Sequence, residues 1–460
     1  MQAVQRLKGL IALGMAFALI LSPFNASAAA QKNDGVKESI REITSTTSSN
    51  YKDLEFLKPI LKDKTVVSLG ENFHRVAEYS SMKTRLIKYL HEEMGFDVIA
   101  FESGLGDAFM TDENAGTWIP AEMMQRSIFP IWHSKETLNL FEYIKKSQET
   151  KNPLHLAGYD MQFTSGYLTQ FLVGWIAKVD KEQGQQYFNF EMQAMTDLYK
   201  VLNEYGMEDG HPEAKAAVKK VKETYEPKYN ALIQFIQEHK KELAAAYPAN
   251  PNMVDIAIKT LGDRVKFIEM GMYNTKESYE FRDRIMADNV EWLMKVMYPG
   301  KKVILWAHND HLAKNTSKIQ TKEQGKWIGS FTSMGELLHK KLKDKAYVIG
   351  LYMNSGKAST ITTQKLFDIK PMPKGSLEEL MMRSGYKIAY ADLSKHKSPK
   401  QSNSWMFKPI YAAEDGMTSE IIEPMSMRFV PREQFDGIIV FDKVKEPTTK
   451  YESGSTRERK

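Results

Sequence analysis

The chain has 460 residues, of which 42% are hydrophobic and 26% charged, and this balance suits a protein with a large core rather than a disordered chain. Its net charge of +5 is small and its basic residues do not form one stripe, so nothing in the sequence indicates nucleic-acid binding. The chain has no cysteine, which excludes disulfide bonds and a lipid anchor on a cysteine. A large hydrophobic core must therefore supply the stability.

The N-terminus has the three parts of a secretory signal peptide. Arg6 and Lys8 precede an apolar stretch over 9–21, and a run of small residues follows at 26–29. The apolar stretch is shorter than the roughly 20 residues that a spanning helix needs, so an uncleaved anchor is the less favoured alternative. We expect cleavage near Ala28, which lowers the net charge from +5 to +3 because the removed residues hold no acid. The sequence thus predicts a secreted or extracytoplasmic protein without a membrane span.

Strand-like and helix-like segments then alternate along the chain. A helix is predicted near 76–94, where apolar residues recur at four-residue spacing before Gly95, and another near 134–149. Alternation of this kind predicts an α/β fold with a mainly parallel sheet and flanking helices. The predicted strands cover 65–69, 98–101, 154–157, 303–307, 346–352, 387–391 and 437–441.

The pattern changes between about 165 and 298, where the sequence is long, charged and helical. We interpret this segment as a helical insertion between two strands, with a free-standing helical domain as the alternative. The α/β core then consists of 29–164 and 299–447. The polar residues 448–460 are predicted to form a disordered tail.

Short polar clusters follow four of the predicted strands. Loops at the carboxyl ends of parallel strands converge on the ligand-binding edge of an open sheet. Six side chains with the chemistry of a hydrolytic site would therefore meet there. They are Glu71, His74, Glu102, Asp160, His308 and His311.

Glu71 and His74 are three residues apart, and His308 and His311 repeat this spacing. Histidine is the usual general base near neutral pH, and a neighbouring carboxylate such as Glu102 fixes its tautomer. The chain lacks cysteine, a Gly-x-Ser-x-Gly elbow and a His-Glu-x-x-His motif, so water is the expected nucleophile.

Two ways of activating that water remain open from the residues alone. A histidine could deprotonate it, in which case no cofactor is needed. Alternatively, a divalent metal could bind it, because Glu-x-x-His and His-x-x-His are also ligand spacings. The four ligands would then be Glu71, His74, His308 and His311. A third interpretation, a secreted protein that binds a small molecule without catalysis, is disfavoured by so many titratable groups in one cluster.

Other candidates have a structural interpretation of similar or greater weight. Arg282 could reach the cleft, or it could form an ion pair with Asp283 or Glu280. A group of large apolar residues could roof the cleft after the second strand, but ordinary core packing is the better interpretation. They are Trp118, Met123, Met124, Phe129 and Trp132.

Taken together, several sequence blocks make the chain resemble the erythromycin esterase family. Their order and combination over roughly 65–340 are highly specific. The blocks are Gly70-Glu71-x-x-His74, Lys83-Thr84-Arg85-Leu86, Gly95-Phe96-x-x-Ile99-Ala100-x-Glu102, Ile131-Trp132-His133-Ser134, Gly158-Tyr159-Asp160-Met161-Gln162, Arg282-Asp283-Arg284, Trp306-Ala307-His308-Asn309-Asp310-His311 and Ser333-Met334-Gly335.

The resemblance implies an α/β hydrolase with a helical insertion that attacks a macrolide lactone with water. It assigns the general base to His74, with Glu71 and Glu102 in support, and places His308 and His311 in the same cleft. It also implies a small-molecule ester as substrate. We expect Lys83, Asp160 and Arg282 to contact it.

One departure concerns the substrate. Macrolide-hydrolysing members have an arginine nine residues after the histidine, where this chain has Lys83, and lysine lacks the planar fork of arginine. Export would also place the protein away from the ribosome that macrolides attack. A role in antibiotic resistance is therefore the less favoured expectation, and another ester outside the cell is the expected substrate.

Overall fold

The computed structural model describes residues 36–205, 212–323, 325–414 and 421–450. The predicted signal peptide and most of the predicted tail lie outside these residues. The described residues all fall within the unit Gly35–Lys460.

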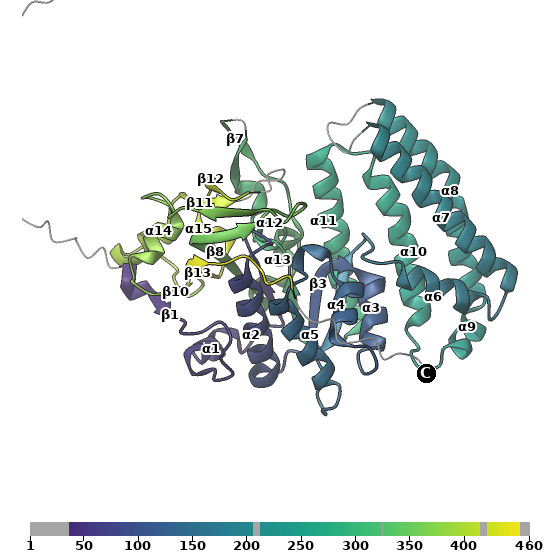
Figure 1. The fold of residues 1–460 in the computed structure, drawn as a ribbon, viewed down its shortest axis with the longest axis horizontal. Coiled ribbons are helices and arrows are strands. Elements are labelled where there is room, and N and C mark those ends of the chain that lie inside the picture. The colour runs from purple at the N-terminus through teal and green to yellow at the C-terminus, as the bar shows by residue number, and fades with distance from the viewer. Residues whose placement is uncertain (1–35, 206–211, 324, 415–420, 451–460) are drawn as a thin grey trace, which may run out of the picture. The chain divides into compact units, whose positions relative to one another are not determined.

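A mainly parallel sheet organises the α/β core and confirms the predicted fold class (Figure 1). Its strand order is β1-β10-β13-β8-β2-β5-β3-β4, with β9 paired to β8. The strands from β13 to β4 pair in parallel, whereas β1, β10 and β9 pair antiparallel to their neighbours. The strands are β1 (Ile40–Glu42), β2 (Val66–Leu69), β3 (Val98–Gly104), β4 (His155–Asp160), β5 (Val303–Trp306), β8 (Ala346–Ser359), β9 (Leu366–Ile369), β10 (Ile388–Asp392) and β13 (Gly437–Val444).

Strand β8 runs seven residues past its predicted end at 352. Its extension pairs with β13 on one side as far as Gly356 and with β9 on the other from Gly356 to Ser359. These partners satisfy backbone groups in a stretch that lacks the apolar pattern of a buried strand. The length of β8 therefore depends on pairing rather than on its own sequence.

The two faces of the sheet bury alternate residues of each strand, as the twofold period of a strand requires. Val67 and Ile99 lie in a core that also holds Leu86 of α2 (Ala77–Met94) and Phe141 of α5 (Lys135–Ser147). On the opposite face, buried residues pack against α11 (Thr275–Trp292) and α13 (Met334–Leu342). Helix α2 ends where predicted, because Gly95 adopts a left-handed conformation with φ of 66°.

Shorter helices complete the connections of the core. They are α1 (Leu57–Leu61), α3 (Leu105–Glu113), α4 (Pro120–Ser127), α12 (Asn309–Leu312), α14 (Leu377–Met382) and α15 (Pro431–Gln434). Of all the helices in the described ranges, not one combines the length and the apolar character needed to cross a membrane.

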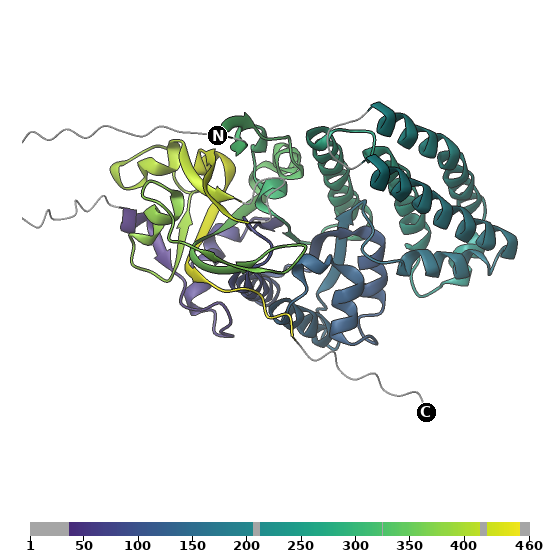
Figure 2. The ribbon, with the colours of Figure 1, turned by 45° about the horizontal axis from the view of Figure 1, so that its top comes forward.

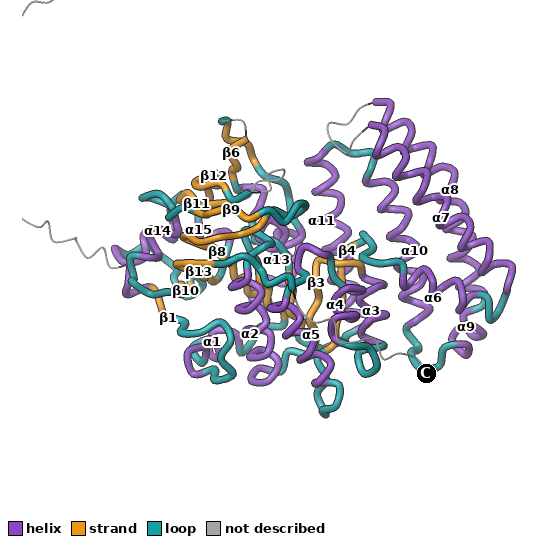
Figure 3. The backbone as a smooth tube through the Cα atoms, in the orientation of Figure 1, coloured by secondary structure: helices purple, strands orange, loops and turns teal. Residues whose placement is uncertain are grey.

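Between β4 and β5 the described residues form a series of helices with its own apolar core (Figure 3). Helix α8 packs against both α7 and α10, and the last helix of the series, α11, leads back to the sheet (Figure 2). The helices that precede α11 are α6 (Tyr167–Ile176), α7 (Lys181–Tyr205), α8 (Pro212–Glu238), α9 (Lys240–Ala246) and α10 (Met253–Met270).

A second, antiparallel sheet of four short strands was not predicted. Its order is β11-β12-β6-β7, formed by β11 (Ile410–Glu414), β12 (Glu423–Phe429), β6 (Gln320–Glu323) and β7 (Lys326–Gly329). Strands β6 and β7 are largely exposed, so they carry no buried apolar run that a sequence pattern could reveal. The sheet matters for the site because its strand β11 ends at Glu414.

Candidate active site

The polar residues predicted at the carboxyl edge of the parallel sheet do meet there. Glu71 and His74 follow β2, Glu102 lies in β3, Asp160 ends β4, and His308 with His311 follows β5. These side chains fall into two groups, one around Glu71 and one around Glu102.

Gly70 allows the loops after β2 and β5 to touch. A Cβ atom at this position would lie 2.1 Å from the Oδ1 atom of Asn309, so any other residue would displace the Asn309 side chain. The N–H of Asn309 donates a hydrogen bond of 2.7 Å to the carbonyl oxygen of Glu71. The two loops that supply three of the histidines are thereby held together.

Three donors surround the carboxylate of Glu71, which is fully buried. Its Oε1 atom accepts from the indole Nε1 of Trp132 at 2.6 Å and contacts the Nδ1 of His74 at 2.9 Å. Its Oε2 atom accepts from the ammonium of Lys83 at 2.7 Å. Burial acts to raise the pKa of Glu71, but Lys83 and His74 together hold that pKa below its usual value.

The ionised Glu71 fixes the tautomer of His74. A carboxylate can only accept hydrogen bonds, so the Nδ1 atom of His74 must carry the proton and Nε2 keeps its lone pair. Burial lowers the pKa of His74, against the opposing effect of Glu71, which favours the neutral ring at pH 7. With 14% of its side chain exposed, His74 is accessible while Glu71 is not.

Lys83 is buried and contacts the carboxylate of this pair. Its buried ammonium bonds to Glu71 and donates at 3.2 Å to the carbonyl oxygen of Ala307, and it lies 4.6 Å from the ring centre of Trp306. Burial lowers the pKa of Lys83 to about 8, although Glu71 acts to raise it. In this position the ammonium contacts Glu71 directly, and Glu71 separates it from His74.

The second group surrounds His311, which lies between two carboxylates. Its Nδ1 is 2.9 Å from both oxygens of Asp283, and its Nε2 is 3.2 Å from the Oε1 of Glu102. Burial acts to lower the pKa of His311, but Asp283 and Glu102 raise it above its usual value. The two acids favour the protonated ring, while a guanidinium nitrogen of Arg282, 3.4 Å from Nε2, acts against it.

Arg282, on α11, joins Glu102 to Asp160. One guanidinium nitrogen donates to Glu102 at 2.7 Å and also contacts Asp160, while Nε donates to Asp160 at 3.0 Å. Burial acts to raise the pKa of Glu102, but His311 and Arg282 lower it to about 2. The ion pairs considered in the sequence, to Asp283 or Glu280, are replaced by these two.

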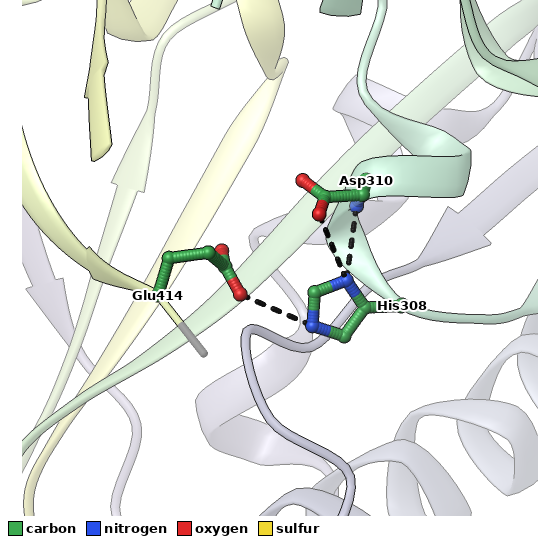
Figure 4. A group of neighbouring side chains, drawn as sticks. All are labelled: His308, Asp310 and Glu414. Atoms are coloured by element: carbon green, nitrogen blue, oxygen red, sulfur yellow. Dashed lines mark hydrogen bonds and ion pairs between the residues drawn. The ribbon is translucent and has the colours of Figure 1, made fainter. Parts of the chain in front are cut away.

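His308 lies between the two groups and at the edge of the second sheet. Its ring centre is 5.1 Å from that of His74, and its backbone N–H donates to Glu102 at 3.3 Å. Its Nδ1 accepts from the backbone N–H of Asp310 at 3.3 Å, and its Nε2 lies 3.1 Å from the Oε1 of Glu414 (Figure 4).

Two of the residues in this arrangement were missed from the sequence. Trp132 was interpreted as core, although the Ile-Trp-His block that contains it was a usable signal. Glu414 carried no signal, because it is brought to His308 by a sheet that the sequence did not predict. Asp283 was considered only as a partner for Arg282.

The four metal ligands considered from the sequence do not face one another as a set. Glu71 binds Trp132, His74 and Lys83, whereas His311 contacts Asp283 and Glu102, so these two residues belong to different groups. Within the described parts of the chain, the group with suitable metal-ligand spacing is instead His308, Asp310 and Glu414. It shares His308 with the predicted set.

The fold and the site together define a class of α/β proteins with a helical segment before β5 and two histidine–carboxylate groups at the carboxyl edge of the sheet. The chain matches the family profile described as erythromycin esterase over residues 91–444. The chain therefore belongs to the erythromycin esterase family, which is a family of hydrolases, as the sequence blocks predicted.

Two relatives and one solved structure illustrate the similarity. The chain is 31% identical to YbfO of Bacillus subtilis (strain 168) over 92% of its own length and 94% of that protein. It is 24% identical to erythromycin esterase type II of Escherichia coli over 68% of its length and 74% of that protein. A crystallised erythromycin esterase mutant in its open conformation shares the fold, with a TM-score of 0.58, 15% identity and coverage of 90% of this chain and all of that one.

Proposed function

We propose that this protein is a secreted hydrolase that cleaves a carboxylic ester or lactone with water activated by His74. The observation that carries the proposal is the bond from His74 Nδ1 to ionised Glu71, which leaves Nε2 free to accept a proton. The similarity to two proteins named erythromycin esterases supports an ester as the substrate class.

In this mechanism His74 Nε2 takes a proton from water as the water oxygen attacks the ester carbonyl carbon. The tetrahedral intermediate then loses its alkoxide, and His74 returns the proton to that leaving oxygen. The products are a carboxylic acid and an alcohol, or a single hydroxy acid from a lactone. Glu71 stays ionised and stabilises the imidazolium that forms on His74 during the reaction, as a buried carboxylate does in other histidine-dependent hydrolases.

The ring of His311 and the guanidinium of Arg282 lie at the same edge of the sheet, where they are paired with Glu102, Asp160 and Asp283. Because these three acids outnumber the two bases, the group balances its own charge, and the proposal assigns the oxyanion to no residue of it. In this proposal Asp160 holds Arg282, and Lys83 acts on the substrate indirectly, by holding Glu71.

We propose further that fourteen-membered macrolides are poor substrates and that the natural ester lies outside the cell. The N-terminal segment resembles a secretion signal, and Lys83 stands where macrolide-hydrolysing members have arginine. An ammonium on Glu71 makes one contact where a guanidinium could make two parallel ones, and this difference changes how firmly the His74 pair is held.

A hydrolysis screen in water enriched in oxygen-18 tests the proposal. Purified protein is incubated with macrolides, aryl esters and envelope-derived esters, and the masses of the products are measured by mass spectrometry. We expect one heavy oxygen in the acid product, and release of alcohol and acid in equal amounts from the first turnover, because water attacks directly and no acyl-enzyme forms. A burst of alcohol before steady turnover would contradict the mechanism, efficient opening of erythromycin would contradict the substrate proposal, and silence on every ester would favour a binding protein.

A further inference from the structure

Three side chains from two different sheets converge beside His74. His308 and Asp310 follow β5 of the main sheet, and Glu414 ends β11 of the second sheet. One ring nitrogen of His308 and one carboxylate oxygen from each acid lie within 4.8 Å of one another (Figure 4). All three residues are buried, each with no more than 9% of its surface exposed.

Each acid of this group contacts one nitrogen of the His308 ring. His308 Nε2 is 3.1 Å from Glu414 Oε1, and His308 Nδ1 is 3.7 Å from Asp310 Oδ2. Ligands that are bound to one zinc ion at about 2.0–2.2 Å lie roughly 3–3.5 Å apart at tetrahedral angles. The two contacts of His308 are to different nitrogens of its ring, and one ion binds only one of them, so Asp310 has to turn toward the nitrogen that faces Glu414 for the three ligands to share an ion.

Asp310 supplies a second, independent observation. Its Oδ1 atom is buried and has no hydrogen-bond partner among the residues that the structure describes. Nor does Asp310 form an ion pair with a lysine or arginine of the described ranges. A buried carboxylate oxygen in this state costs free energy unless a cation or a donor reaches it.

The donor set indicates which cation fits. One imidazole nitrogen and two carboxylates suit a divalent transition ion such as Zn²⁺ or Mn²⁺, whereas Mg²⁺ and Ca²⁺ prefer oxygen ligands alone. Three protein ligands leave a coordination position open to water, as in catalytic rather than structural zinc sites.

We infer that His308, Asp310 and Glu414 form a binding site for a divalent transition-metal ion of the Zn²⁺ type. The two acids neutralise the charge of the ion, and the second sheet completes the site by delivering Glu414. The site differs from the ligand set considered from the sequence, and it leaves Glu71 and His311 in their present contacts. Its existence does not depend on whether an ester is the substrate.

The test is calorimetric titration of Zn²⁺ into the full chain after chelation and gel filtration. We expect one ion per chain, with a heat signal that depends on the buffer, because His308 must bind as a deprotonated nitrogen. Loss of one ligand in Asp310→Asn or Glu414→Gln should weaken affinity by more than about 10–100-fold, the cost of changing even an outer contact to a metal. Glu423→Gln is the matched control, since Glu423 is the exposed register partner of Glu414 on β12.

X-ray absorption on the wild-type zinc form gives a readout that does not depend on a variant folding. It should show one nitrogen and at least two oxygens at about 2.0–2.2 Å. Absence of stoichiometric binding, or unchanged affinity in both ligand variants, would overturn the inference. Ester hydrolysis is measured separately on the chelated protein, so that loss of the metal site and loss of the proposed activity are distinguished.

Discussion

The two histidine groups at the sheet edge use similar residues for opposite purposes. His74 has one carboxylate partner, Glu71, and that carboxylate also accepts hydrogen bonds from Lys83 and Trp132. His311 has a carboxylate at each ring nitrogen. The pKa of the first histidine is therefore lowered, which favours the neutral ring, and the pKa of the second is raised, which favours the charged ring.

For these two rings, the number of acids in contact, rather than the spacing in the sequence, sets the direction in which the pKa shifts. Glu-x-x-His and His-x-x-His look equivalent as motifs. Burial lowers the basicity of both rings, and only the pair of acids around His311 overcomes that effect. A histidine that favours the neutral ring and one that favours the charged ring consequently stand at the same edge of one sheet.

The largest effect that we expect is on catalysis. His74→Ala removes the proposed general base. The substitution should lower kcat by about 10²–10⁴ on whichever ester the screen identifies. Steady-state kinetics measure the change. His239→Ala, in the helical segment between β4 and β5, is the control and should leave kcat unchanged. Full activity in His74→Ala would assign the base to another group.

The largest loss of folding stability is expected from a substitution of Arg282, in the group around Glu102. Arg282→Met leaves Glu102 and Asp160 buried and without their shared cation, and loss of one partner from a buried ion pair costs about 3–5 kcal/mol. Chemical denaturation measures this loss. Arg284→Met, two residues along α11 and exposed, should change stability by less than about 0.5 kcal/mol. Equal effects of the two substitutions would mean that the Arg282 bridge contributes nothing specific.

The sequence predicted the fold well because the central strands bury both faces. Runs such as 65–69 and 303–307 are apolar regardless of their neighbours, and the polar residues that follow them reach the sheet edge by topology alone. The second sheet was missed because its short strands are stabilised by pairing with one another. Glu414, which belongs to it, was missed for the same reason.

Within the site, the sequence predicted which residues gather but not what each one contacts. The positions of Glu71, His74, Glu102, Asp160, His308 and His311 follow from strand ends. Their protonation depends on Trp132, which is 61 residues from Glu71, and on Asp283, which is 28 residues from His311. Distances of this kind are set by tertiary packing and leave no periodicity in the chain.

A smaller effect is expected at Trp132. Trp132→Phe keeps an aromatic ring against His74 but removes the N–H that donates to Glu71. A hydrogen bond to a buried charged group contributes about 1.5–3 kcal/mol, so the variant should be less stable by that amount and should show a reduced kcat with little change in KM. Trp118→Phe, a nearby tryptophan that makes no contact with Glu71 in the described structure, is the matched control. An unchanged kcat in Trp132→Phe would show that the indole N–H does not contribute to catalysis and that Trp132 acts only through packing.

The smallest effects should be on the pH dependence of stability, where the two histidines have opposite signs. The folded-state pKa of His311 is raised, so its contribution is fully present below the unfolded value of about 6.5 and is lost as pH rises through the folded pKa. The folded-state pKa of His74 is lowered, so folding favours the neutral ring, and stability falls as pH drops from about 6.5 through the folded pKa. Urea unfolding at pH 5 and pH 9 separates the contributions of the two histidines.

His311→Gln should destabilise the protein more at pH 5 than at pH 9. His74→Gln should destabilise it more at pH 9 than at pH 5. Each difference should be about 1.4 kcal/mol per unit of pKa shift. If both variants changed with pH in the same direction, the two histidines would share one protonation state and the division of the site into a neutral and a charged histidine would be wrong.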